Sequence, residues 1–152
     1  MNRDNIFEQL KVDEGVVYEV YKDHLGYPTF GVGHLILESD EEFEKEVGTL
    51  VSEERVKACF EKDLDTSISE CVALYGDDWD KFQGTVQEVL VNMMFNMGRP
   101  RLSKFKKFQA AIESEDFITA SEEMEDSRWF KQVGPRAERL QARIYSLGIP
   151  NG

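Results

Sequence analysis

The feature that most constrains this chain is a change of hydrophobic period at Gly15. Residues 6–14 carry the apolar spacing of a helix, which the glycine is expected to end. From Val16 to Leu37 the chain is rich in Val, Tyr, Phe and Gly around a turn-like KDHLG, which predicts a small antiparallel sheet. The rest has helical spacing, so we expect an α+β, predominantly α-helical protein.

Capping residues predict where the helices begin and end. We expect Asn5 to cap the first helix, Ser52 a long helix that reaches Leu74, and Pro135 to open the last. Two capping boxes predict further helix starts, and glycines predict helix ends. These are Ser39 with Glu42, Thr85 with Glu88, and the glycines Gly48, Gly98 and Gly148. Apolar spacing adds helices near residues 105–112 and 117–124, and the methionines of residues 93–97 are expected to fill the core.

The charge is large, negative and uneven. The net charge is −12, which argues against nucleic acid as the main partner. Residues 1–90 hold 8 Lys and Arg against 22 Asp and Glu, whereas residues 91–152 hold 10 against 8. The late basic residues could meet an anionic ligand, although a solvated helix face is the simpler explanation. With no apolar stretch long enough for a signal peptide or a membrane span, we expect a soluble protein made in a cytoplasm, without membrane insertion.

With only two cysteines and two histidines, the sequence predicts neither a disulfide nor a metal site. Cys59 and Cys71 lie about 18 Å apart if they share one helix, so they cannot bond to each other there. We expect both to be free and buried. No further His or Cys stands at ligand spacing from His34, so neither a metal nor another cofactor is expected.

Two carboxyl groups in the opening segment suggest acid–base chemistry. Glu14 is the last residue before the helix-ending Gly15, where the negative end of a helix disfavours its charged form. Asp23 stands in a polar turn, where free backbone amides favour the ionised form, and Thr29 on the next strand could hold a water against it. An acid and a base of this kind are what glycosidic cleavage needs. Among 30 acidic residues such a spacing also arises by chance.

Their order, however, resembles the active-site segment of the phage lysozymes of the T-even type, glycoside hydrolase family 24. The pattern E(x8)D(x5)T followed by G-x-G-H occurs as Glu14, Asp23 and Thr29 followed by residues 31–34. Segments FEKDLD, NMMFNMG and SRWFKQVGPRA agree in order, so the resemblance covers nearly the whole chain. It implies one lysozyme-like domain over residues 1–152. A sheet-bearing lobe at about 13–60 and a helical lobe at about 75–152, packed with helix 5–14, would be joined by the long helix.

The resemblance also implies a function. Such enzymes are inverting muramidases that cleave the β-1,4 bond between N-acetylmuramic acid and N-acetylglucosamine in bacterial peptidoglycan, and cause lysis after release to the wall. Glu14 would donate the proton, while Asp23 and Thr29 would activate water between carboxyls about 6.5 to 9.5 Å apart. No cofactor is implied, and a monomer is the default. A catalytically inactive wall-binding protein and a lytic transglycosylase of the same fold remain alternatives.

Further site residues follow from matched positions. Leu35 and Phe95 would line the sugar cleft, Arg136 would pair with Glu14, and His34 would bond Asp63 in a structural role. The chain departs from the family at three positions expected to contact substrate. They are Asn96, where a longer amide is familiar, Phe108, where a small polar residue is usual, and Glu123, where an amide is usual.

Overall fold

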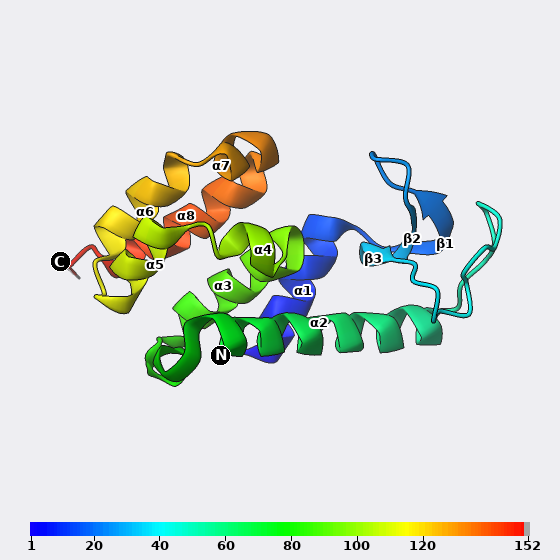
Figure 1. The fold of residues 1–152 in the computed structure, drawn as a ribbon, viewed down its shortest axis with the longest axis horizontal. Coiled ribbons are helices and arrows are strands. Elements are labelled where there is room, and N and C mark those ends of the chain that lie inside the picture. The colour runs from blue at the N-terminus through cyan, green and yellow to red at the C-terminus, as the bar shows by residue number, and fades with distance from the viewer. Residues whose placement is uncertain (151–152) are drawn as a thin grey trace. The chain divides into compact units, whose positions relative to one another are not determined.

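The computed structural model describes residues 1–150 and has the predicted α+β, mainly helical architecture (Figure 1). The described residues form eight α-helices, one 3-10 helix and a three-stranded sheet. The helices are α1 (Arg3–Glu14), α2 (Glu53–Tyr75), the 3-10 helix η1 (Gly76–Lys81), α3 (Gly84–Met97), α4 (Arg99–Leu102), α5 (Lys106–Glu113), α6 (Phe117–Glu125), α7 (Arg128–Val133) and α8 (Pro135–Leu147). The strands are β1 (Val17–Lys22), β2 (Pro28–Gly31) and β3 (His34–Leu35).

Internal contacts divide the chain into two compact units. The first, Asp4–Thr66, is called the sheet unit below, and the second, Met1–Arg3 with the chain from Ser67 onward, the helical unit. Helix α2 begins in the sheet unit and ends in the helical unit. The sequence also predicted that helix 5–14 packs against the helical lobe. That contact would lie between the two units, and it stays a prediction.

The predicted sheet is present, with its strands in the antiparallel order β1-β2-β3. Tyr21 pairs with Thr29 across β1 and β2, and Thr29 pairs with Leu35 across β2 and β3. Because directly opposed residues of antiparallel strands share a face, these three side chains stand in one row. Val20 and Phe30 are fully buried.

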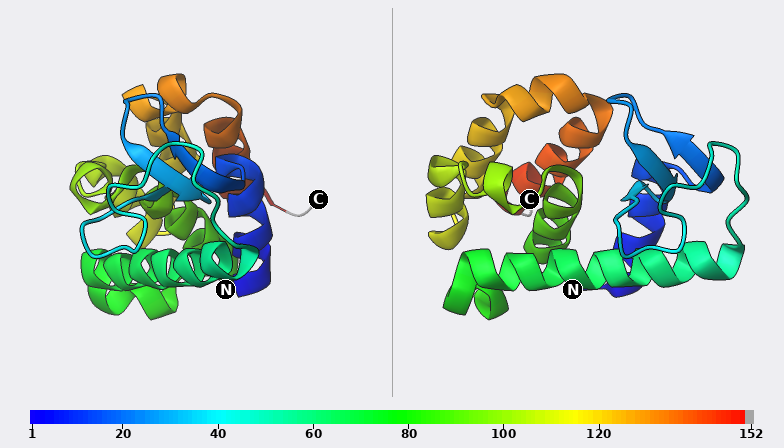
Figure 2. Two further views of the ribbon diagram at one scale, coloured as in Figure 1. Left: turned by 90° about the vertical axis from the view of Figure 1, so that its right-hand side faces the viewer. Right: turned by 45° about the vertical axis from the view of Figure 1, so that its right-hand side comes forward.

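Helix α1 packs on the first half of α2 inside the sheet unit. The rings of Phe7 and Phe60 stack with their centroids 4.5 Å apart. Figure 2 shows α1 running across α2, with the strands beside them. Leu10 and Leu64 are fully buried on these helices. This packing fixes the position of α1 within the sheet unit, and hence where Glu14 lies at the end of that helix.

The helix predicted from Ser39 to Gly48 is absent, and residues 36–49, called the turn segment below, form turns instead. Glu42, the carboxylate of the predicted capping box, and its neighbour Asp40 make other bonds. Asp40 accepts the backbone N–H of Leu37 at 2.8 Å, and both oxygens of Glu42 accept from Arg55 on α2 at 2.9 Å. Glu44 has φ 66°, which a continuous right-handed helix excludes.

The helical unit has α3 at its centre. Val89, Leu90 and Met93 are fully buried, and Met94 and Met97 nearly so, which confirms that the methionines fill the core. Helices α5 and α8 both pack against α6, as Figure 1 shows.

Most predicted helix ends are confirmed, whereas the starts predicted at Asn5 and Thr85 are wrong, in addition to the absent helix at Ser39. Ser52 Oγ accepts the N–H of Arg55, and Pro135 and the glycines at 15, 98 and 148 stand at helix boundaries as expected. Helix α1 begins at Arg3, before Asn5. Glu88 does not cap α3, because its carboxylate accepts from the N–H of Asn2 and from Arg143. The short helices α4 and α7 were not predicted. None of the helices among residues 1–150 combines the length and the apolar character needed to cross a membrane.

Candidate active site

Glu14 is the last residue of α1, and its carboxylate lies against the turn between β2 and β3. Gly15 ends the helix with φ 75° and donates its N–H to Lys11 at 2.9 Å. A Cβ built on Gly33 would lie 3.0 Å from Oε2 of Glu14, closer than real Cβ contacts normally come. The absence of a side chain at Gly33 therefore makes room for the Glu14 carboxylate.

Asp23 is held by the turn that joins β1 to β2. Its Oδ1 accepts the backbone N–H groups of Leu25 and Tyr27, both at 2.9 Å. Its own N–H donates to the carbonyl of Tyr27, and its carbonyl accepts from Gly26. Four bonds within one turn fix the orientation of this carboxylate.

Thr29 lies on β2 beside that turn and is 4% exposed. Its hydroxyl donates to the carbonyl of Tyr27 at 2.9 Å. The hydroxyl proton is therefore already used in a hydrogen bond. A water could still donate a hydrogen bond to the lone pairs of Oγ1.

Tyr21 on β1 interacts with all three of these residues. Burial raises the pKa of Tyr21, and the negative charges of Glu14 and Asp23 raise it further. The phenol therefore interacts electrostatically with both carboxylates. Tyr21 also stands opposite Thr29 in the sheet. In the sequence Tyr21 is only one of the aromatic residues of the predicted sheet, and the strand register is what shows its position opposite Thr29. The distance between the carboxyls of Glu14 and Asp23 stays a prediction.

His34 begins β3, next to Gly33, and bonds carboxylates with both ring nitrogens. Its Nδ1 lies 2.6 Å from Oδ2 of Asp63, the pair implied by the resemblance, and its Nε2 lies 2.8 Å from Oδ2 of Asp40. Burial of the ring opposes the charged form, but the bonds to Asp63 and Asp40 outweigh it and raise the pKa of His34. Two carboxylate acceptors require a proton on each nitrogen, so His34 is an imidazolium in this arrangement.

The other predicted site residue of the sheet unit is Leu35. It is 47% exposed on β3, opposite Thr29. An exposed apolar side chain in the same row as Thr29 and Tyr21 is compatible with a sugar-contacting role, which stays a prediction.

In the helical unit the residues predicted to contact substrate lie in two places. Phe108 and Glu123 border a hollow of about 420 Å³ between α5 and α6, although Phe108 is only 1% exposed. Half-buried Phe95 and Asn96 are on α3, where Oδ1 of Asn96 accepts from Nε1 of Trp129 at 2.7 Å. Their substrate contacts stay predictions.

Arg136 is buried at the start of α8. Its Nε donates to Oδ1 of Asn92 at 2.9 Å, and Nη2 lies 3.4 Å from the carbonyl oxygen of Asn92. Its predicted pairing with Glu14 would join the two units, and it stays a prediction.

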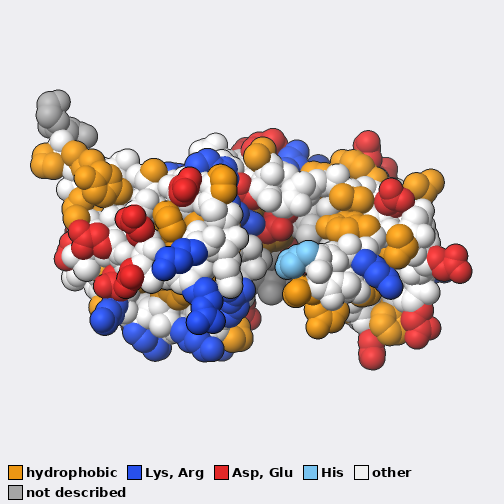
Figure 3. All heavy atoms as spheres, turned by 90° about the horizontal axis from the view of Figure 1, so that it is seen from above, with side chains coloured by type: hydrophobic (Ala, Val, Ile, Leu, Met, Phe, Trp, Pro, Cys, Tyr) orange, Lys and Arg blue, Asp and Glu red, His pale blue; other side chains and the backbone are white. Residues whose placement is uncertain are grey.

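Basic side chains surround the hollow that Phe108 and Glu123 border. Lys104, Lys106 and Lys107 contribute to its lining, together with Asp126. Figure 3 shows Lys and Arg side chains gathered on one side of the helical unit. The late basic cluster found in the sequence is thus partly gathered around one concave surface.

Both cysteines are free and buried, as predicted. Burial raises the pKa of Cys71 to about 12 and raises that of Cys59 as well, so neither thiol is poised as a nucleophile. The chemistry of the site therefore rests on the carboxyl groups.

The family model of the phage lysozymes matches residues 11–144, which include every candidate residue above. The chain belongs to the phage lysozyme family. The chain is 31% identical to probable T4-type lysozyme 2 of Dictyostelium discoideum, over 88% of its own length and 89% of that protein. It is also 31% identical to the pre-baseplate central spike protein Gp5 of Enterobacteria phage T4, over 93% of its own length but 28% of that protein.

A third relative is the peptidoglycan hydrolase gp36 of Pseudomonas phage phiKMV, 28% identical over 83% of the chain and 13% of that protein. Family membership confirms the predicted class, a glycoside hydrolase of the lysozyme type, and the predicted lysozyme-like α+β fold. The catalytic roles of individual residues are not part of that result.

Proposed function

We propose that the protein is a muramidase that hydrolyses the β-1,4 bond between N-acetylmuramic acid and N-acetylglucosamine in bacterial peptidoglycan, with inversion at the anomeric carbon. The observation that carries the proposal is that Glu14 and Asp23 both act electrostatically on Tyr21, which stands opposite Thr29 in the sheet. Membership of the phage lysozyme family and similarity to a protein named as a peptidoglycan hydrolase support the substrate. Lysis of bacteria, after release of the protein to the wall, is the biological role that follows.

Glu14 is the general acid in this mechanism. It enters the reaction protonated and gives its proton to the leaving glycosidic oxygen as the bond to the anomeric carbon breaks. The space beside Gly33 sets the direction in which its carboxyl group points. A fixed direction matters because the acid must reach one oxygen of a bound chain.

Asp23 is the base and Thr29 its partner. A water between them gives one hydrogen bond to Asp23 and one to Oγ1 of Thr29, whose own proton is held by Tyr27. The water then has its lone pair free to attack the anomeric carbon, and Asp23 takes the proton that it loses. Because Oδ1 of Asp23 already accepts two amide bonds, Oδ2 is the oxygen assigned to the water.

The test compares Glu14→Gln and Asp23→Asn with the unchanged protein on purified peptidoglycan. We expect release of new reducing ends to fall about 10²–10⁴-fold in each variant, the usual contribution of a general acid or base. Glu8→Gln is the control, since Glu8 is an exposed carboxylate of the same helix, paired only loosely with Lys11 at 3.3 Å, and its loss should leave activity unchanged. Full activity of Glu14→Gln would remove Glu14 from the acid role.

The products separate this mechanism from the alternatives. Proton NMR during the first turnovers should show the α-anomer at the newly formed reducing end, because a single displacement of a β bond inverts the carbon. Products with a 1,6-anhydro ring in mass spectra would indicate a lytic transglycosylase. Binding of peptidoglycan fragments with no new reducing ends would indicate an inactive binding protein.

A further inference from the structure

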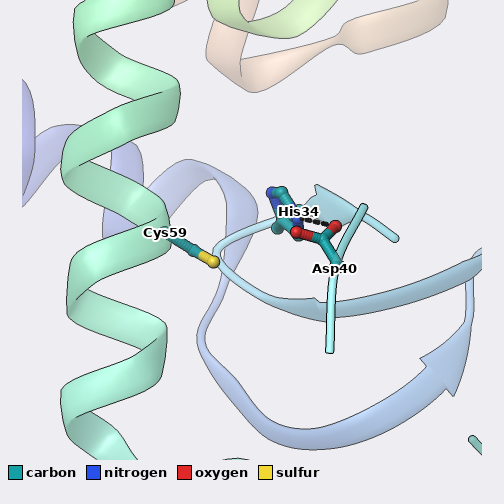
Figure 4. A group of neighbouring side chains, drawn as sticks. All are labelled: His34, Asp40 and Cys59. Carbon is teal, nitrogen blue, oxygen red and sulfur yellow. Dashed lines mark hydrogen bonds and ion pairs between the residues drawn. The ribbon is translucent and has the colours of Figure 1, made fainter. Parts of the chain in front are cut away.

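Three side chains that could ligate a metal meet beside β3 in the sheet unit. His34 comes from β3, Asp40 from the turn segment and Cys59 from α2, and their ligand atoms lie within 4.8 Å of one another. Figure 4 shows Cys59 pointing from α2 toward His34 and Asp40. Cys59 lies 25 residues after His34 in the sequence, so their spacing predicted no site.

The donor atoms fit a particular class of ion. Imidazole nitrogen, carboxylate oxygen and thiolate sulfur together suit Zn²⁺ and similar divalent transition metals, whereas Mg²⁺ and Ca²⁺ prefer oxygen alone. Ligand atoms about 2 Å from an ion in tetrahedral geometry stand roughly 3.5 Å apart. Nε2 of His34 and Oδ2 of Asp40 are 2.8 Å apart, and Sγ of Cys59 is within 4.8 Å of a ring nitrogen of His34 and of a carboxylate oxygen of Asp40, so small side-chain movements reach that spacing.

Neighbouring groups already orient two of the ligands. Asp63 bonds Nδ1 of His34 at 2.6 Å, which leaves Nε2 turned toward Asp40. A carboxylate on the far nitrogen of a histidine is the usual support of a metal-bound imidazole. Nη2 of Arg55 lies 3.3 Å from Oδ1 of Asp40, so Oδ2 is the oxygen that faces His34.

We propose that His34, Asp40 and Cys59 bind one divalent transition-metal ion such as Zn²⁺. The ion replaces two protons, one on Nε2 of His34 and one on Sγ of Cys59, so the net charge of the cluster stays the same. It joins β3, the turn segment and α2 in one coordination sphere and thereby holds the turn segment to the helix. The role is structural and separate from the proposed hydrolysis, since none of the three ligands belongs to the acid–base set.

Cobalt is the probe for the test, because Co²⁺ takes the place of Zn²⁺ in such sites and its bond to a thiolate gives a near-ultraviolet charge-transfer absorption. The full chain, freed of metal by a chelator, is titrated with Co²⁺. We expect the absorption to appear and saturate at one ion per chain. Its absence from the unchanged protein overturns the proposal, whatever the variants do.

Matched variants assign the ligands. Cys71→Ser is the control, because Cys71 is the other buried thiol of the same helix and lies outside the cluster. We expect it to keep the absorption, whereas Cys59→Ser loses it. The reverse result, or absorption that survives in Cys59→Ser, overturns the assignment. Circular dichroism verifies that each variant is folded.

Asp63→Asn tests the supporting bond. Outer carboxylates of this kind change metal affinity by roughly 10 to 100-fold, so Co²⁺ should bind that much more weakly with the same absorption spectrum. A change of spectrum instead would make Asp63 a ligand. Zn²⁺ should also raise the midpoint of thermal unfolding of the unchanged protein and of Cys71→Ser, and leave Cys59→Ser unmoved. A rise of equal size in Cys59→Ser would show that Zn²⁺ binds elsewhere, and would overturn the site.

Discussion

Gly33 leaves the space that the Glu14 carboxylate occupies, because a side chain at residue 33 would lie against that carboxylate. Its φ of 63° and the 3.0 Å between a built Cβ and Oε2 of Glu14 make an alanine there both strained and obstructive. The Glu14 carboxylate is the flexible partner, so it is the group that would move. Gly33 thus sets the position of the proposed acid without taking part in the chemistry.

The first prediction concerns Gly33→Ala. Displacing a catalytic group by about 1 Å can cost on the order of 10²-fold in rate, so we expect kcat to fall by roughly that factor. We expect the free energy of unfolding to fall by only about 1 kcal/mol, the cost of a side chain at positive φ. Reducing-end assays and urea unfolding measure the two quantities.

Gly76→Ala is the matched control for this prediction. Gly76 has φ 59°, and nothing lies within 4 Å of a Cβ built there. It should lose the same stability as Gly33→Ala and keep its activity. Equal activity in the two variants would show that the space beside Gly33 does not position the acid.

The second prediction uses Tyr21 as a sensor of the two carboxylates. Burial first, and then the charges of Glu14 and Asp23, raise the pKa of Tyr21. Removing either charge stabilises the phenolate, so the pKa of Tyr21 should fall in both Glu14→Gln and Asp23→Asn. Tyrosine ring carbons labelled with ¹³C report this titration by NMR, and Tyr21→Phe assigns the signal. A pKa of Tyr21 that moves in only one variant would place the other carboxyl elsewhere.

Local signals predicted much of the fold, because they act over a few residues. Ser52 does cap α2, Gly98 ends α3 and Pro135 opens α8. Each depends only on backbone preferences or on a bond to the next turn. The change of period after Gly15 likewise located the sheet.

Predictions failed where a side chain bonds a distant partner. Glu42 binds Arg55 on α2, and Glu88 binds Arg143 on α8, so neither completes the local capping box that its spacing suggested. The position of Tyr21 opposite Thr29 depends on the strand register, and the meeting of Asp40 with Cys59 depends on the path of the turn segment. Neither relationship leaves a spacing signal in one sequence.

The third prediction concerns Arg55, which holds the turn segment to α2. Its Nε and Nη2 both donate to Glu42 at 2.9 Å, and Nη2 also reaches Asp40 at 3.3 Å. Lysine keeps the charge but cannot form this fork, so Arg55→Lys should lower the free energy of unfolding by about 1–2 kcal/mol in the presence of EDTA. Urea unfolding provides the measurement.

Arg99→Lys is the control for Arg55→Lys. Arg99 pairs with Glu70 at 3.1 Å, but both side chains are more than 40% exposed. Exposed pairs contribute little, so its effect should stay within about 0.5 kcal/mol. Losses of similar size in the two variants would mean that the fork to Glu42 adds nothing to stability.

The last prediction assigns Asn96 a structural role beside any contact with substrate. Trp129 is 2% exposed, and its Nε1–H donates to Oδ1 of Asn96 at 2.7 Å. Asn96→Ala leaves that buried donor without its acceptor, so we expect the free energy of unfolding to fall by about 1–3 kcal/mol. Asn96→Asp keeps an acceptor oxygen and should lose less. In the background of Trp129→Phe, which has no donor, Asn96→Ala should cost at least 0.5 kcal/mol less, roughly the smallest coupling seen between contacting residues. Costs that simply add in a double-mutant cycle would show that this bond does not stabilise the fold.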